Sequence, residues 1–258
     1  MGTEPRIDEL WQRLRIPAGG DLFNPASVAD LPAPARRYFL HAIAPGTPLA
    51  RSVVLTMHGH IGLRPGAARS PFQARQILST VGLIWQARLG HGLLRVSGYD
   101  LYAEGQGAMR WSLWGLLPVV RAGGPDITRS AAGRLALEAP LWLPSALLPR
   151  SWSGWKPRWE EVNDRVARVR IRIGDEELAP LLFISPEGRL ERIEMNRWDS
   201  KGLTGTPGYV PWVGDRIGED RTFSGYTIPT VAHPIAKAGT PQENLFMDLV
   251  IDTADYTA

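Results

Sequence analysis

A single carboxylate stands in one of the most apolar stretches of this chain. Fifteen residues separate Arg134 from Arg150, and Glu138 is the only charged residue among them. A carboxyl group that loses water on burial has a raised pKa. A raised pKa suits a general acid, or a neutral hydrogen-bond donor near neutral pH. Glu138 is therefore the first candidate for catalytic chemistry.

Two roles remain open for Glu138. On a helix, Arg134 would stand four residues before it, a spacing that favours an ion pair. Glu138 would then be a structural partner of Arg134, or a carboxylate near a helix end that reaches solvent. Alternatively, it would project into an apolar pocket and transfer protons there.

A second carboxyl and a second arginine extend this candidate site. Asp100 follows Tyr99 on an expected strand and is the second candidate catalytic residue. Arg75 lies on another expected strand and is a candidate charge partner for either carboxyl. Nothing in the spacing of these residues shows that they meet.

Aromatic residues supply the expected walls of a pocket. The chain contains ten tryptophans, and four of them, Trp142, Trp152, Trp155 and Trp159, fall within eighteen residues. Plain core packing explains most buried tryptophans, but aromatic walls around one polar group also suit the binding of an apolar ligand. The residues expected to bind such a ligand are Arg75, Trp85, Tyr102, Trp111, Trp114 and Trp142.

Two histidines are a weaker candidate for metal binding. His58 and His60 lie two residues apart on an expected strand, so both rings would point to one face. A third ligand is missing nearby, and a solvated pair beside turns at Gly59 and Gly62 explains the pattern as well. We therefore predict no metal site, and the sequence indicates no cofactor.

Composition excludes several classes of function. The chain has 258 residues, no cysteine and a formal net charge of +3, so disulfides and thiol chemistry are excluded. Acidic and basic residues are interspersed, and Arg168, Arg170 and Arg172 alternate with apolar residues like the solvent face of a strand. We expect no nucleic-acid partner. The oligomeric state stays open.

The sequence also bears on location. No apolar run reaches the roughly 18 residues of a membrane span, so we expect no stable membrane insertion. The charged, amphipathic N-terminus lacks the apolar centre of a secretory signal. A cytoplasmic location is the resulting expectation.

Two short helices are expected before the first strand. In Arg6–Arg15, apolar residues recur at helical spacing. A second helix is expected to start after Pro32, with the proline near its first turn. The sequence from Arg51 onward alternates like strands joined by short connectors, which favours an antiparallel arrangement. About ten strands are expected in all, and the expected strands nearest the C-terminus are Arg221–Ile228, Val231–Ala236 and Leu245–Ile251, with Pro229 and Pro234 as the breaks between them.

One longer helix interrupts the strands. Asp126 or Thr128 is the expected N-cap of a helix that runs to about Ala139, with Pro140 as the expected interruption. We predict an α+β fold: a large curved antiparallel sheet, like a half-barrel, wrapped around a central helix near residues 126–139. Residues 1–50 would form an N-terminal helical segment and residues 51–258 the sheet domain.

Several motifs resemble an uncharacterised bacterial family, a domain of unknown function. They are Gly123–Asp126, the run Arg134–Pro149, Trp159–Val169, Leu181–Ile193, Val210–Gly214 and Phe223–Pro229. The family carries no established activity that could be transferred. The strand pattern of Leu181–Trp198, together with the closing Gly-Tyr-Thr-Ile-Pro, is also distantly similar to bacterial lipoprotein carriers. That likeness implies a half-barrel with an apolar cavity.

Three functions remain open at this point. The first is binding of an apolar small molecule, such as a lipid, a terpenoid or a polyketide-like compound, in a cavity lined by tryptophan. The second is an enzyme that uses Glu138 or Asp100 for acid–base catalysis in isomerisation, cyclisation or hydrolysis. The third is a structural or interaction protein with a filled core. Replacing Glu138 with glutamine should spare binding but remove acid–base catalysis.

Overall fold

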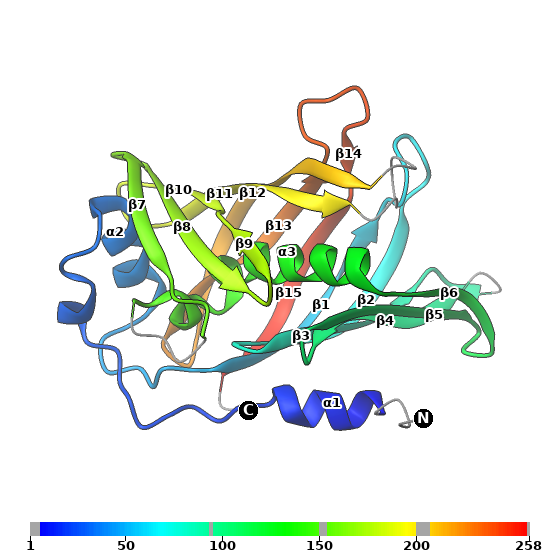
Figure 1. Ribbon diagram of the computed structural model, residues 1–258, viewed down its shortest axis with the longest axis horizontal. Coiled ribbons are helices and arrows are strands. Elements are labelled where there is room, and N and C mark those ends of the chain that lie inside the picture. The colour runs from blue at the N-terminus through cyan, green and yellow to red at the C-terminus, as the bar shows by residue number, and fades with distance from the viewer. Residues whose placement is uncertain (1–5, 93–94, 150–153, 200–206, 257–258) are drawn as a thin grey trace.

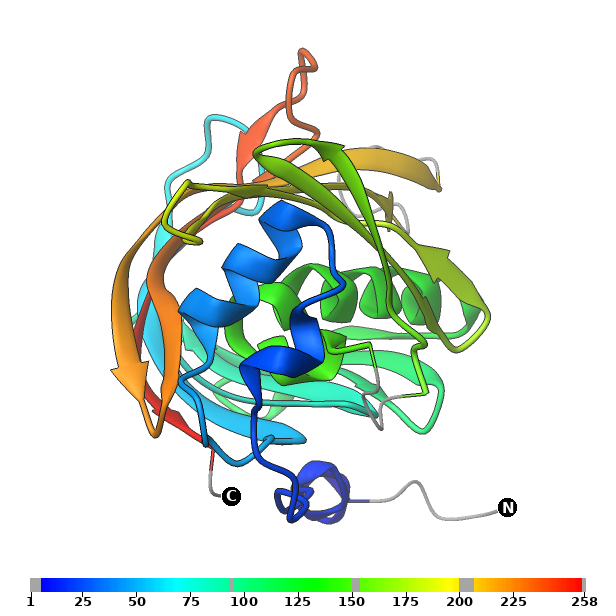
Figure 2. The same cartoon turned by 90° about the vertical axis from the view of Figure 1, so that its left-hand side faces the viewer.

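One large, curved antiparallel sheet surrounds a central helix. The computed structural model describes residues 6–92, 95–149, 154–199 and 207–256. In Figure 1 the sheet bends around the helix α3 (Pro125–Trp142), and Figure 2 shows the same arrangement from one end. The expected antiparallel sheet and central helix are confirmed, although the fold is mainly β. Its description as a half-barrel stays a prediction.

The helices are short apart from α3. α1 spans Ile7–Leu14 and α2 spans Ala33–Ala42, as the sequence predicted to within a few residues. Two single 3-10 turns accompany them: η1 (Pro25–Val28), which is exposed except for Val28, and η3 (Pro144–Leu147), which is buried in the core. None of the described helices has both the length and the apolar character needed to cross a membrane. The cytoplasmic location stays a prediction.

The first half of the chain builds six strands by successive hairpins. They are β1 (Ser52–Ile61), β2 (Ser70–Ser79), β3 (Gly82–Leu89), β4 (Val96–Ala103), β5 (Gln106–Leu113) and β6 (Leu117–Gly123). Each pairs with the next along the chain, and β6 is one edge of the sheet. Alternation of side chains puts one face of these strands toward α3.

The second half continues the same sheet after α3. Its strands are β7 (Arg158–Asn163), β8 (Val166–Ile173), β9 (Glu176–Leu178), β10 (Leu181–Ile184), β11 (Leu190–Asp199), β12 (Gly208–Phe223), β13 (Tyr226–Ala236), β14 (Asn244–Leu245) and β15 (Met247–Asp255). β15 pairs with both β1 and β13, which joins the two halves. The described sheet has fifteen strands, with β6 and β7 as its unclosed edges, so the expectation of about ten was too low.

Strand alternation in β8 follows the sequence prediction. Val169, Ile171 and Ile173 are buried, while Arg170 and Arg172 are exposed. Arg168 and Arg170 both contact Glu160 on the neighbouring strand β7. These arginines therefore belong to a surface ion-pair group, as expected for the solvent face of a sheet.

Two predictions about α3 are wrong. The helix begins at Pro125, and Gly124, with a φ of 95°, precedes it as the N-cap. Thr128 instead links the helix to β5 by accepting a hydrogen bond from the Gly107 amide. The helix also continues through Pro140 to Trp142. Pro140 lies in the last turn, where the buried residues after it hold the helical path that a proline disfavours.

The strands near the C-terminus also differ from the prediction. The expected strand over 221–228 in fact spans a turn, in which Ser224 and Gly225 both have positive φ values. Two such residues in succession match the tight turns that join twisted antiparallel strands. Pro229 and Pro234, expected as breaks, lie within β13. β13 pairs with β15 only at Val231 and Ala232, between the two prolines.

A single apolar core joins α2 and α3 to the concave face of the sheet. Phe39 and Ile43 are fully buried in it together with Leu135 of α3. The Tyr38 hydroxyl donates to the carbonyl oxygen of Pro140 at 2.7 Å. In contrast, α1 packs on the convex face through a smaller cluster that includes Trp11. Side chains from before and after residue 50 share this core. The division between residues 1–50 and 51–258 stays a prediction.

One buried hydroxyl fixes the connection into β1. Tyr226 donates to the Pro48 carbonyl at 2.9 Å and accepts from the Ala50 amide at 2.7 Å. Replacing Tyr226 with phenylalanine would leave both backbone groups without this hydrogen-bond partner, which should lower the free energy of unfolding by about 1–3 kcal/mol. Chemical denaturation measures this loss. Tyr209 is the matched control, because its exposed hydroxyl bonds to the Arg129 and Glu176 side chains, which water can solvate after replacement with phenylalanine. That replacement should cost less than about 1 kcal/mol.

Candidate functional site

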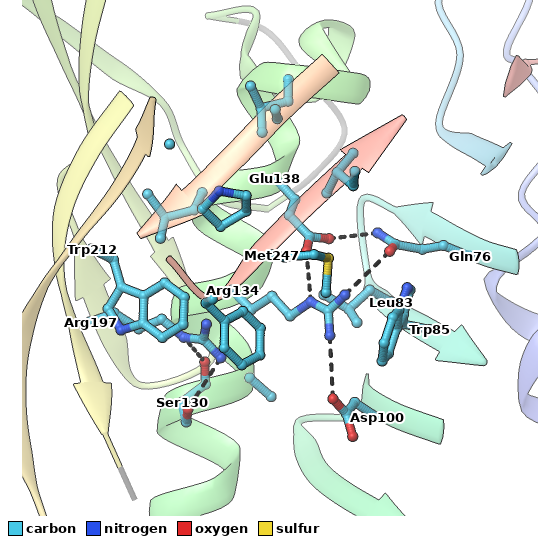
Figure 3. Close-up of a pocket in the computed structure, with 18 of the residues that line it drawn as sticks. Gln76, Leu83, Trp85, Asp100, Ser130, Arg134, Glu138, Arg197, Trp212 and Met247 are labelled. Carbon is cyan, nitrogen blue, oxygen red and sulfur yellow. Dashed lines mark hydrogen bonds and ion pairs between the residues drawn. The ribbon is translucent and has the colours of Figure 1, made fainter. Parts of the chain in front are cut away.

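A cavity of ≈ 240 Å³ lies between α3 and the concave face of the sheet. Strands from both halves of the chain contribute to its wall, including β3, β4, β11, β12 and β15. Most of the wall is apolar. Its polar side chains are Gln76, Asp100, Ser130, Arg134, Glu138, Arg197 and Asp199. Figure 3 shows that Gln76, Asp100 and Glu138 gather around Arg134, and that Ser130 contacts Arg197.

Arg134 is the centre of the first polar group. Its Nε donates to Glu138 Oε1 at 2.6 Å, one helical turn away on α3. Its two terminal nitrogens donate to Asp100 and Gln76, each at 3.4 Å. Gln76 closes the ring by donating to the second oxygen of Glu138 at 2.5 Å. The guanidinium carbon also lies 5.0 Å from the centre of the Trp85 ring, which adds a cation–π contact.

Asp100 occupies the outer end of this group. Its Oδ1 accepts from the indole nitrogen of Trp111 at 2.9 Å. Burial raises the pKa of Asp100, while the positive charge of Arg134 and the Trp111 hydrogen bond oppose that rise. The net direction is upward, so Asp100 holds a proton to a higher pH than an ordinary aspartate does. The pKa of Asp100 is therefore shifted in the direction expected of a general acid.

Arg197 forms the second polar group, across the cavity from Asp100. Its guanidinium donates to the backbone oxygen of Ser130 at 2.9 Å and to the Ser130 hydroxyl at 3.3 Å. It lies 4.7 Å from the centre of the Trp212 ring. Burial and the nearby charge of Arg134 lower the pKa of Arg197 to about 10. Within the described part of the chain, Arg197 forms no ion pair.

A glycine in α3 makes room for Arg197. A Cβ atom added to Gly133 would lie 2.8 Å from Cγ of Arg197. A glycine inside a helix costs about 1 kcal/mol relative to alanine. The aliphatic part of the Arg197 side chain passes close over the helix, which is a physical reason for a glycine at position 133.

Four of the sequence-predicted residues meet at the cavity. Glu138 and Asp100 both line it, as do Trp85 and Trp142. The two alternative positions of Glu138 are both realised, because it lines the cavity and is paired with Arg134. Trp111 lies just behind the wall, where it contacts Trp85 and holds Asp100.

Three predicted residues lie away from the cavity. Arg75 points to the convex face, where it donates to Gln86 at 2.7 Å and stacks on Trp11. The charge partner of both carboxyls is therefore Arg134 and not Arg75. Trp114 is exposed in the turn between β5 and β6, and Tyr102 is buried elsewhere in the core.

The expected tryptophan group is only partly assembled. Trp142 lines the cavity, but Trp155 and Trp159 do not. Trp159 instead donates to the Leu147 carbonyl at 3.0 Å and packs on Phe39. Trp152 lies outside the described residues. The aromatic wall of the cavity thus comes from segments distant in sequence: α3, β3, β12 and the link between β14 and β15. Its members Trp212 and Phe246 were unforeseen.

The histidines pair with separate aspartates. His58 lies 2.9 Å from Asp252 and His60 lies 3.3 Å from Asp248, both on the exposed side of β1 and β15. No group of three or more potential metal ligands occurs among the residues that the structure describes. Each histidine therefore has a local partner on the neighbouring strand.

Comparisons with known proteins give a family but no activity. A family model described as "Family of unknown function (DUF6544)" matches residues 21–244. The matched range includes α3 and every polar residue of the cavity wall. The comparison with curated proteins found no match.

The raised pKa of Asp100 predicts a pH-dependent stability. Between the ordinary aspartate pKa and the raised one, the folded protein keeps a proton that the unfolded chain releases, so stability is lost as pH rises through this window. The asparagine in Asp100→Asn resembles the protonated carboxyl but does not titrate, so the variant does not lose stability in this pH window. Its free energy of unfolding, relative to the unaltered protein, should rise with pH. Denaturation at a series of pH values measures the difference, and a constant difference would contradict the raised pKa.

Proposed function

The chain belongs to this family of unknown function, and from its cavity we propose that the protein binds a small apolar molecule between α3 and the sheet. The observation that carries the proposal is the cavity itself. It provides ≈ 240 Å³ of space beside mostly apolar side chains, and a concave, mostly apolar pocket with a few polar groups is the usual form of a small-molecule site. A bound apolar molecule would remove this apolar surface from water.

The size of the cavity narrows the class of ligand. Ligand pockets usually measure about 300–1,000 Å³, so ≈ 240 Å³ favours one short acyl chain or a small terpenoid over a lipid with two chains. Met57, Met109 and Met247 line the apolar part. Their flexible thioethers suit ligands of somewhat different shape.

The second arginine supplies a position for one polar group of the ligand. Arg197 donates only to Ser130 among the described residues and keeps further donors. Burial and Arg134 disfavour its charge, so a carboxylate or hydroxyl on the ligand would find a partner there. Arg134 is already held by Glu138, Gln76 and Asp100. We therefore assign polar recognition to Arg197.

The likeness to lipoprotein carriers belongs with this proposal. A curved antiparallel sheet, a helix on its concave face and an apolar cavity between them are the features that the likeness implies. They support binding as the function, and not any particular cargo.

Enzyme activity is the second candidate, because of Asp100. A carboxyl with a raised pKa, beside an apolar space and oriented by Trp111, has the properties of a proton donor to an alkene, an epoxide or an enol. Glu138 accepts hydrogen bonds on both oxygens, which suits a role in orienting Arg134. In this alternative we place proton transfer on Asp100 and keep Glu138 as the second choice.

Filling the cavity tests the binding proposal. Ala131 lines the cavity on α3, so Ala131→Phe should occupy the space of the ligand. Dodecanoic acid serves as the probe, and isothermal titration calorimetry should show its affinity fall by about tenfold or more. Ala68, which is exposed, is the matched control, and Ala68→Phe should leave the affinity unchanged. Equal affinity in all three proteins would refute binding in this cavity.

Two carboxyl variants separate a binding protein from an enzyme. Asp100→Asn and Glu138→Gln each remove proton transfer at nearly constant shape. For any substrate that is turned over, loss of the general acid should lower kcat by about 100-fold or more, while dodecanoic acid binding persists. Steady-state kinetics of both variants measure this. Full turnover in both would exclude acid–base catalysis by either residue.

A further inference from the structure

Exposed apolar side chains concentrate at one tip of the molecule. Twelve large apolar residues are exposed in the described part of the chain, and five of them lie between Trp114 and Val120. Leu116 is 79% exposed and Leu117 is 54% exposed. Single exposed apolar residues are ordinary on protein surfaces, but a contiguous group marks an interaction site. This tip group (Trp114, Leu116, Leu117, Val119 and Val120) lies on the turn between β5 and β6 and on β6 itself.

Positive charge predominates in the strands that lead to the tip. The stretch from Arg69 to Gly123 contains six arginines and two acidic residues. Of the two acidic residues, Asp100 faces the cavity, and Glu104 lies in the turn at the opposite end of β5, paired with Arg13. Arg95 and Arg121 are exposed close to the tip. The apolar tip therefore has a cationic rim without a nearby acidic counterpart on β5 or β6.

The form of β6 disfavours pairing with a strand of another protein. β6 is an edge of the sheet, and exposed edges invite such pairing. Here, however, Pro118 removes one amide donor, and the register shifts between Trp111 and Ser112 opposite it. Edge prolines and bulges are devices that prevent strand addition. The side chains of β6 are exposed along nearly its whole length, on both faces. A flat protein partner would cover only one of those faces, whereas a fluid apolar phase would cover both.

We propose that the hairpin of β5 and β6 docks on a membrane surface that contains anionic lipids. Leu116, Leu117 and Val119 would enter the boundary between headgroups and acyl chains, and Trp114 would lie at headgroup level, where tryptophan is favoured. Arg95 and Arg121 would meet lipid phosphates. Figure 1 shows this hairpin at one end of the molecule, with α2 at the other.

The register of the hairpin links this tip to the cavity. Val120 lies opposite Trp111, and Leu117 lies opposite Leu113. Cross-strand partners share a face of the sheet, and Trp111 contacts Trp85 and Asp100 at the cavity wall. An apolar face thus runs from the tip toward the cavity. Docking does not require that the cavity is occupied, so the two proposals can fail separately.

Vesicle flotation tests the docking proposal. The full chain should float with vesicles of phosphatidylcholine and phosphatidylglycerol, and less with phosphatidylcholine alone. Leu116→Glu with Leu117→Glu should lower the partition coefficient by about 100-fold, because each leucine buries enough apolar surface for roughly a tenfold effect. Arg121→Gln should lower binding only to the anionic vesicles, and added salt should weaken that binding.

A matched leucine provides the control. Leu22 is 58% exposed, and it precedes η1 in the segment that leads to α2 at the other end of the molecule. Leu22→Glu should leave flotation unchanged, and circular dichroism should show that all variants are folded. Absence of flotation by the unaltered chain would overturn the proposal. So would equal loss on Leu22→Glu. A dimer in sedimentation that the tip variant dissociates would assign the surface to a second copy of this chain instead.

Discussion

The Arg134 guanidinium connects the central helix to three strands and thereby sets how closely they approach. It bonds to Glu138 on its own helix, to Gln76 on β2 and to Asp100 on β4, and it stacks over Trp85 on β3. Displacing the guanidinium from this position would break its contacts with these partners, and breaking a buried charged contact is costly. The helix is therefore held at the distance that its polar contacts require. The apolar side chains beyond them do not close the remaining space, and the cavity lies there.

Stability alone is a poor reason for this arrangement. Replacing a buried ion pair by well-packed apolar residues is often neutral or stabilising, and filling a cavity usually stabilises as well. Both the Arg134 group and the open space next to it run against that preference. Arg197 adds a second buried cation. Its side chain requires a glycine at position 133, although glycine stabilises a helix less than alanine does. The combination is easier to understand as a binding site than as a core.

Local sequence signals predicted much of the fold, and their failures have a common cause. Alternation and turn residues indicated the antiparallel sheet, and the capping residues Asp126 and Thr128 indicated the central helix, although neither of them is its N-cap. Proline misled the prediction at Pro140 and at Pro229. In both places the proline was taken as a break, because its effect on the local backbone is unfavourable. Burial of Trp142 after one of them, and pairing of β13 with β12 around the other, outweigh that local cost.

Part of the site could be predicted from the alternation of side chains between the two faces of each strand. Arg197 follows Ile193 and Met195 at intervals of two, so the same alternation that buries those residues directs Arg197 inward. By the same rule Gln76 shares a face with Phe72, while Arg75 must point the other way. The meeting of Asp100, Arg134 and Gln76 could not be read in this way. It depends on how far the sheet curves around α3, which no local pattern specifies.

Native mass spectrometry tests the central claim, that the cavity holds a small apolar molecule, most directly. The protein would be purified gently from cells and then incubated with straight-chain carboxylic acids of increasing length. We expect a single bound molecule per chain, with retention that rises with the length of the acid and then falls when the acid exceeds the cavity. The mass of the bare chain alone at every length, with or without the acids, would contradict it.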